Sequence, residues 1–187
     1  MKRLLSGNDA IAQGAYEAGV RVGTAYPGTP STEILEALSR FPDVRTLWAP
    51  NEKVALETAL GTAYAGARAI VAMKHVGVNV AADPFFYGVY TGAEAGLVIV
   101  SADDPGMHSS QNEQDNRNYA RFARMPMLEP SDSLEARDFA RLAFDISEQF
   151  DVPVLLLPTT RISHSHSLVE VGPQFTPTLK ETKPYHR

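Results

Sequence analysis

The residues best suited to chemistry stand where apolar runs end. Glu52 opens a predicted helix behind a capping Asn51, and His75 and Asn79 follow the apolar run 67–73. An acidic side chain in the first turn of a helix stabilises it by about 0.5 kcal/mol, so Glu52 has an ordinary structural explanation. A lone histidine after an apolar strand is likewise more often structural than catalytic. The alternative is that these groups face a ligand.

Two further segments are polar in the same way. "YPGTPST" (26–32) brings hydroxyls and a helix start together, which suits an anionic group, although no Walker or Rossmann glycine pattern accompanies it. Asp103, Asp104 and His108 lack a metal-ligand spacing, and Asp-Asp-Pro-Gly is first a turn signal. We therefore assign no metal ligand, and a metal-dependent hydrolase that uses these three residues is the weakest alternative.

The periodicity predicts an α/β fold with three αβα layers and a mainly parallel sheet of about six strands. Ser6 or Asn8 should cap the first helix, and Thr29 and Pro30 should begin the second as its N-cap and first residue. The other expected segments are strands at 20–26, 44–49, 67–73, 96–102 and 152–158, helices at 6–20, 31–40, from Asn51, at 79–90 and at 133–150, and polar loops at 74–79 and 103–124.

Right-handed crossovers place the loops that follow parallel strands at one edge of the sheet, where open α/β sheets bind ligands. The polar segments after the strands should therefore converge there. We expect one domain over residues 1–165. Residues 166–187 are rich in Pro, Ser, Thr and His with little periodicity, which indicates a tail or the start of an interdomain linker.

Composition excludes several classes of function. The net charge is -5, from 17 basic and 22 acidic residues, without a basic cluster for nucleic acid. The apolar runs are too short for a membrane span, and the start of the chain lacks a signal peptide, so we expect a cytoplasmic protein. With no cysteine in the chain, disulfides and cysteine-ligated iron–sulfur clusters are excluded here.

Taken together, the motifs resemble one family. The segments "YPGTPSTEI", "KHVGVNVAADP", "DDPGMHSSQNEQDNR" and "TTRISHSHS" are similar to the N-terminal pyrimidine-binding domain of indolepyruvate ferredoxin oxidoreductase alpha subunits. These belong to the thiamine diphosphate-dependent 2-oxoacid:ferredoxin oxidoreductases. The resemblance covers residues 4–170, and its most specific blocks are the second and third segments.

The resemblance implies a role for particular residues. Glu52, rather than Glu57, matches the glutamate that hydrogen-bonds N1′ of the cofactor's aminopyrimidine and so favours its reactive tautomer. It is the expected catalytic residue. Cofactor contacts are expected from Glu52 and from Tyr26, Pro27, His75 and Asn79. Substrate contacts are expected from Thr29, which resembles a carboxylate-binding threonine, and from His75.

The family also implies partners that these 187 residues do not supply. They are a diphosphate-binding domain that holds Mg, a ferredoxin-like domain with iron–sulfur clusters, a beta subunit, ferredoxin and CoA. We therefore expect the isolated chain to be inactive, to expose an apolar face and to form a homodimer. We also expect it to be either a piece of a longer chain or one product of a split gene. The alternatives are a split 2-oxoacid decarboxylase subunit without redox function, and a non-catalytic domain for assembly or ligand sensing.

Overall fold

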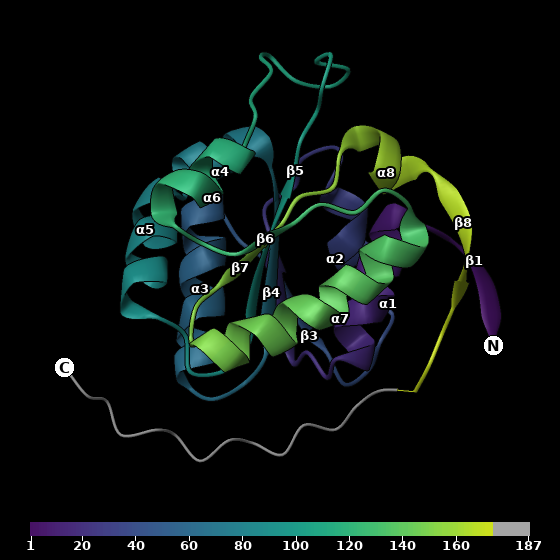
Figure 1. Ribbon diagram of the computed structural model, residues 1–187, viewed down its shortest axis with the longest axis horizontal. Coiled ribbons are helices and arrows are strands. Elements are labelled where there is room, and N and C mark those ends of the chain that lie inside the picture. Colours follow the sequence, from purple (N-terminus) through teal and green to yellow (C-terminus); the bar gives the residue numbers. More distant parts are fainter. Residues whose placement is uncertain (174–187) are drawn as a thin grey trace.

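The computed structural model describes residues 1–173 and shows a parallel sheet covered by helices on both faces (Figure 1). The sheet has six strands in the order β3-β2-β4-β5-β7-β6, and every pairing is parallel. The three-layer α/β prediction is confirmed. The strands are β2 (Val22–Ala25), β3 (Arg45–Trp48), β4 (Ala69–Lys74), β5 (Leu97–Ala102), β6 (Met127–Leu128) and β7 (Val154–Leu156).

Two apolar clusters fill the space between the sheet and its helices. One lies under α1 (Gly7–Glu17), α2 (Thr32–Leu38) and α7 (Ser133–Phe150), and the other under α3 (Glu52–Tyr64), α4 (His75–Val80), α5 (Ala82–Thr91) and α6 (Arg117–Ala123). β4 and β5 are buried almost throughout because each carries apolar side chains on both faces, as expected for central parallel strands. None of the helices in residues 1–173 has the length and apolar character needed to span a bilayer.

Local capping signals predicted several helix starts correctly. Ser6 caps α1, where its Oγ accepts a hydrogen bond from the Asp9 N–H at 3.0 Å. Asn51 caps α3 in the same way, through Oδ1 and the Val54 N–H at 2.9 Å. The caps satisfy amide donors that the first helical turn leaves without partners.

The predicted start of the second helix is wrong by two residues. Thr29 and Pro30 lie in a turn with a cis peptide bond between them, and α2 begins at Thr32 with Ser31 as its N-cap residue. The turn is closed by the Ser31 hydroxyl, which donates to the Gly28 carbonyl at 2.9 Å. The Thr32 hydroxyl also accepts from the Gly28 N–H at 2.9 Å, so residues 28–32 form a hydrogen-bonded turn and the helix begins only at its end.

Two segments expected to be loops contain helices. Residues 74–79 enter α4 at His75 directly from the strand, and α6 lies inside the polar run 103–124. Both helices are short, and α4 carries Gly77 and three valines, which have weak intrinsic helix propensity. Tertiary contacts therefore decide these two elements.

Residues 166–170, expected to be a tail, form a strand. β8 (His166–Glu170) follows the short helix α8 (Thr160–His164) and pairs antiparallel with β1 (Lys2–Ser6). The pairing joins opposite ends of the described chain, which no local pattern shows. The first residues after the expected domain boundary at 165 are therefore paired with the first strand of the domain. Residues 174–187 of the expected tail lie outside the described residues.

Helix α7 crosses α1 at very short range. A Cβ at Gly14 would lie 2.2 Å from the Arg137 carbonyl oxygen, so only glycine permits the approach. Beside it, the Arg137 guanidinium donates to the buried carboxylate of Glu17. On the far side of the helix pair, Arg68 donates to Glu148 at 2.8 Å and to the Ala18 carbonyl.

The substitution Gly14→Ala should destabilise the fold, because the added methyl group cannot fit without separating α1 from α7. We expect the free energy of unfolding to fall by about 2–3 kcal/mol, the usual cost of overpacking. The matched control is Gly61→Ala in α3, where a Cβ meets nothing within 4 Å and should stabilise by about 0.5–1 kcal/mol. Urea unfolding of both variants checks this, and equal effects would contradict the close crossing.

Candidate active site

The carboxyl ends of β2, β3, β4 and β5 meet at one edge of the sheet, as the parallel arrangement requires. At that edge the chain between β5 and α6 projects beyond the helices (Figure 1). The turn 26–31, the start of α3, the start of α4 and the loop 103–116 all follow these strand ends. The expected convergence of the polar segments is confirmed.

Glu52 is the first residue of α3 and lies at this edge with 8% of its surface exposed. Within residues 1–173 its carboxylate has no hydrogen-bond or ion-pair partner. Helix α3 is held to the sheet by the Thr24 hydroxyl of β2, which donates to the Ala55 carbonyl at 2.8 Å. A charged group that is nearly buried is costly unless a partner satisfies it, although the positive N-terminus of α3 offsets part of that cost. Such a carboxylate is suited to accept a hydrogen bond from a ligand.

Gly77 of α4 forms the surface on which Glu52 rests. A Cβ at Gly77 would lie 2.7 Å from Cγ and Oε1 of Glu52. The backbone of α4 therefore packs directly against the carboxylate and limits its rotamers. Sequence reasoning missed Gly77, although a glycine inside a short helix is a signal of close backbone approach.

His75 is fully buried at the beginning of α4. Its Nε2 is 3.0 Å from the Asn112 carbonyl, and because a carbonyl only accepts, the ring donates from Nε2. The His75 carbonyl in turn accepts from the Asn116 side chain at 2.9 Å. His75 Nδ1 and Asn112 Oδ1 are buried without partners among the described residues. In this conformation the histidine holds the loop 103–116 and presents no ring nitrogen at the surface.

The turn that was expected to contact cofactor and substrate is accessible. Tyr26, Pro27 and Thr29 are all exposed after the end of β2. Gly28, between them, lies against Lys74 at the end of β4, where a Cβ would meet the Lys74 Cδ at 3.1 Å. The structure therefore brings this turn to the same edge as Glu52, with the Thr29 side chain open to solvent.

Lys74 connects two of the converging segments. Besides its contact with the turn, its Nζ donates to the Ser109 carbonyl of the loop 103–116 at 2.8 Å. Asn79 lies at the other end of α4, is exposed, and accepts a hydrogen bond from the Tyr119 hydroxyl of α6 at 2.6 Å. Asn79 is thus directed to α6, and no described contact joins it to Glu52.

Asp104 fastens the loop by three hydrogen bonds. One oxygen accepts from the Ser109 N–H at 2.8 Å and from the Ser110 hydroxyl at 2.7 Å, and the other accepts from the Thr160 hydroxyl at 2.8 Å. Burial by itself would raise the pKa of Asp104, but these donors outweigh it and lower the pKa to about 2. The carboxylate is a structural anchor that is ionised at neutral pH.

Asp103 shows the opposite balance. Its carboxyl accepts from the Asn116 N–H at 3.0 Å and from the Ser101 hydroxyl at 3.3 Å. Burial nevertheless raises the pKa of Asp103 to about 6, against the lowering effects of those donors and of nearby His75. Both aspartates thus accept hydrogen bonds from residues of the loop 103–116. Residues 1–173 contain no group of three or more His, Cys, Asp or Glu arranged to hold a metal ion.

Comparison with known proteins identifies the family of this chain. Residues 13–187 match the family described as "Pyruvate flavodoxin/ferredoxin oxidoreductase, thiamine diP-bdg". The chain belongs to this family. The resemblance inferred from the motifs is therefore confirmed, together with the implied thiamine diphosphate-binding domain.

The relatives are longer than this chain. It is 54% identical over 178 residues to the indolepyruvate oxidoreductase subunit IorA of Archaeoglobus fulgidus, covering 91% of this chain and 29% of that protein. The IorA subunit of Methanothermobacter thermautotrophicus is 51% identical over 174 residues, with 28% of it covered. The chain thus spans less than a third of the length of these relatives.

A more distant relative and a solved structure extend the comparison. The 2-oxoglutarate synthase subunit KorA of Methanothermobacter thermautotrophicus is 29% identical and is covered over 47% of its length. The 2-oxoglutarate:ferredoxin oxidoreductase of Magnetococcus marinus has a TM-score of 0.81 at 19% identity, covering 96% of this chain and 32% of that one. At this identity the structural match supports the fold alone.

The substitution Gly77→Ala should displace the Glu52 side chain, because the added methyl group would occupy the space of its Cγ and Oε1. We expect a crystal structure of the variant to show Glu52 in another rotamer, with a loss of about 1–3 kcal/mol in the free energy of unfolding. Gly28→Ala is the control, because its new methyl group meets only the flexible Lys74 side chain. An unmoved Glu52 in the Gly77 variant would contradict the contact.

The substitution Asp104→Asn should make stability depend on pH in a defined window. At pH 7 we expect a loss of about 2 kcal/mol, because the folded pKa is lowered from 3.8 to about 2. A lowered pKa stabilises the fold above the unfolded value of about 3.9, and this stabilisation disappears as pH falls through about 2. Denaturant unfolding at pH 7, 4 and 2 measures the difference between the two proteins. A difference that is constant across this range would show that the charge contributes nothing.

Proposed function

We propose that this chain supplies the pyrimidine-binding half of the thiamine diphosphate site in an oxidoreductase that oxidatively decarboxylates arylpyruvates such as indolepyruvate. The product would be an aryl-acetyl-CoA, with electrons passed to ferredoxin. One observation carries the proposal: Glu52 is a largely buried residue whose carboxylate has no partner in the described part of the chain and lies at the edge where the strand-end segments converge. A hydrogen-bond acceptor of this kind fits the protonated N1′ of an aminopyrimidine.

In this proposal Glu52 would accept a charge-assisted hydrogen bond from N1′–H, which would stabilise positive charge on the ring and make the neighbouring amino group more acidic. The backbone of Gly77 limits the rotamers of this carboxylate, so the acceptor would be held in one orientation for N1′. When bound, thiamine diphosphate supplies the nucleophilic carbon and the electron sink for loss of CO2. In this proposal the chain contributes the hydrogen-bond acceptor, Glu52, and the backbone that orients it, Gly77.

The remaining site residues divide by exposure. Tyr26, Pro27 and Thr29 are accessible, so we propose that Tyr26 and Pro27 form a wall for the cofactor and that the Thr29 hydroxyl donates to the substrate carboxylate. His75 is buried and bound to Asn112, so we propose that it positions the loop 103–116 over the site. We propose Asn79 as a further cofactor contact, which requires the hydrogen bond from the Tyr119 hydroxyl to Asn79 to break.

The proposed partners follow from what the site lacks. A second domain would bind the diphosphate with Mg, and a ferredoxin-like domain with iron–sulfur clusters, a beta subunit, ferredoxin and CoA would complete a cytoplasmic enzyme. Leu47 and Trp48 support a covering partner, because both are 44% exposed on the edge strand that leads to Glu52. The greater identity to the IorA subunits than to KorA, 54% against 29%, supports an arylpyruvate over 2-oxoglutarate.

The substitution Glu52→Gln in the assembled enzyme that contains this chain tests the proposal. We expect turnover of indolepyruvate to fall by about 10²–10⁴-fold, because an amide cannot stabilise a protonated N1′ as a carboxylate does. Glu57→Gln in the same helix is the matched control and should retain activity. Thermal unfolding of both variants must match that of the unmodified protein, and thiamine diphosphate binding by calorimetry gives a second readout. Unchanged turnover in the Glu52 variant would overturn the assignment.

A further inference from the structure

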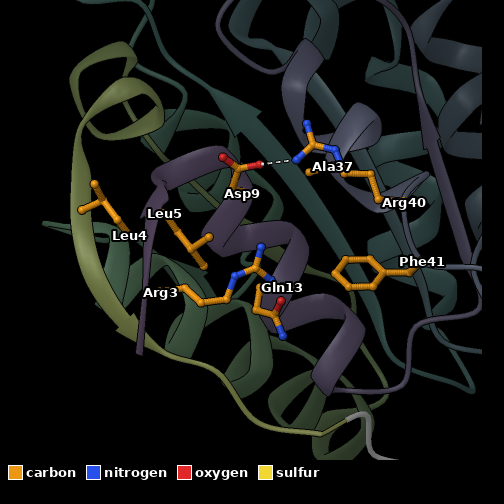
Figure 2. A pocket seen from close by; sticks show the side chains of 8 residues that line it. All are labelled: Arg3, Leu4, Leu5, Asp9, Gln13, Ala37, Arg40 and Phe41. Atoms are coloured by element: carbon orange, nitrogen blue, oxygen red, sulfur yellow. Dashed lines mark hydrogen bonds and ion pairs between the residues drawn. The ribbon is translucent and has the colours of Figure 1, made fainter. Parts of the chain in front are cut away.

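A cavity lies between β1, α1 and the end of α2, and shares no residue with the strand-end loops around Glu52 (Figure 2). Its volume is about 430 Å³, within the range of about 300–1,000 Å³ that is usual for small-molecule sites. Figure 2 shows Arg3 extending from β1 toward Gln13, while Arg40 extends from the chain after α2 toward Asp9. None of these residues has a part in the proposed reaction.

The polar side of this cavity is positively charged. The Arg3 guanidinium has no hydrogen bond or ion pair with any residue in 1–173. Arg40 makes a single weak pair with Asp9, at 3.4 Å, and its side chain is 71% exposed. Asp9 is shared further, because its other carboxylate oxygen already accepts from the Ser6 hydroxyl at 2.8 Å. The residues that line the cavity thus include two arginines and one carboxylate, Asp9, which leaves an excess positive charge for an anion.

The remaining residues that line the cavity are mostly apolar. Leu5 and Ala37 belong to the buried core, and Phe41 is fixed by stacking on Tyr16 with ring centroids 3.9 Å apart. Gln13 is also buried, and its amide donates to Glu17 at 2.9 Å. Side chains held in this way lose little conformational entropy when a ligand binds. The wall suits a flat apolar body rather than a hydrated ion.

From these charged and apolar lining residues we propose that the cavity binds a small aryl carboxylate. The carboxylate would lie between the guanidinium groups of Arg3 and Arg40, which donate paired hydrogen bonds of the kind arginine makes with carboxylates. The ring would pack on Leu5 and Phe41. Because the arginines come from β1 and from the end of α2, a bound ligand would connect these two elements across α1.

Titration with phenylacetate, monitored by calorimetry and by NMR of the backbone and side-chain N–H groups, tests the proposal on this chain. We expect shifts at Arg3, Gln13 and Arg40, and binding that weakens as salt is added. Arg3→Gln and Arg40→Gln should each weaken binding by about tenfold, as loss of a charged hydrogen bond does. Arg45→Gln is the matched control, since it removes the same charge from the exposed edge strand β3, away from the cavity.

Two comparison ligands decide whether the charged and the apolar lining residues both contribute to binding. Phenylacetamide has the ring without the charge, and inorganic phosphate has charge without the ring, so both should bind at least about tenfold more weakly than phenylacetate. Equal binding of either ligand, equal loss in the Arg45 variant, or shifts confined to the edge around Glu52 would overturn the proposal. Circular dichroism of each variant confirms that it is folded.

Discussion

The parallel pairing of β4 between β2 and β5 is the constraint on which the rest of the structure depends. Ala72 lies opposite both Ala25 and Val100, so the three strands end at nearly the same level. The segments that follow them must then emerge together, whatever their own sequences are. Because β4 and β5 are buried on both faces, helices cover the sheet on each side and leave only the edges accessible.

The position of Glu52 results from two contacts of different kinds. Asn51 caps α3 and sets where the helix begins, which places the carboxylate at the first turn. Gly77 then sets where the carboxylate can point, because α4 starts immediately after β4 and passes over it. A side chain at position 77 would occupy the same space as the carboxylate. The absence of a loop between β4 and α4 therefore matters for the chemistry, since it brings a backbone surface to the acceptor.

The loop 103–116 is attached to the sheet by two neighbouring carboxyl groups in different electrostatic states. Asp104 is satisfied by donors from the loop and from α8, and stays ionised. Asp103 is buried with fewer compensating contacts, so its proton is held to a higher pH. Lys74 and His75 add attachments from the end of β4. The loop is thereby held against the same strand end that carries α4 and Gly77, which couples its position to the environment of Glu52.

The sequence by itself determined the central strands, the capped helices α1 and α3, the long helix α7, and the family, through motifs that are each contiguous along the chain. These signals are local: alternation of apolar residues, caps one turn from their amides, and short blocks of residues. Only the tertiary structure decided that β8 pairs with β1, that residues 74–79 are helical, and that α2 begins at Thr32. It also decided that Gly77 touches Glu52, that His75 is buried, and that Arg3 and Arg40 line one cavity. Each of these depends on contacts between distant segments, whose free energy exists only once the sheet has brought those segments together.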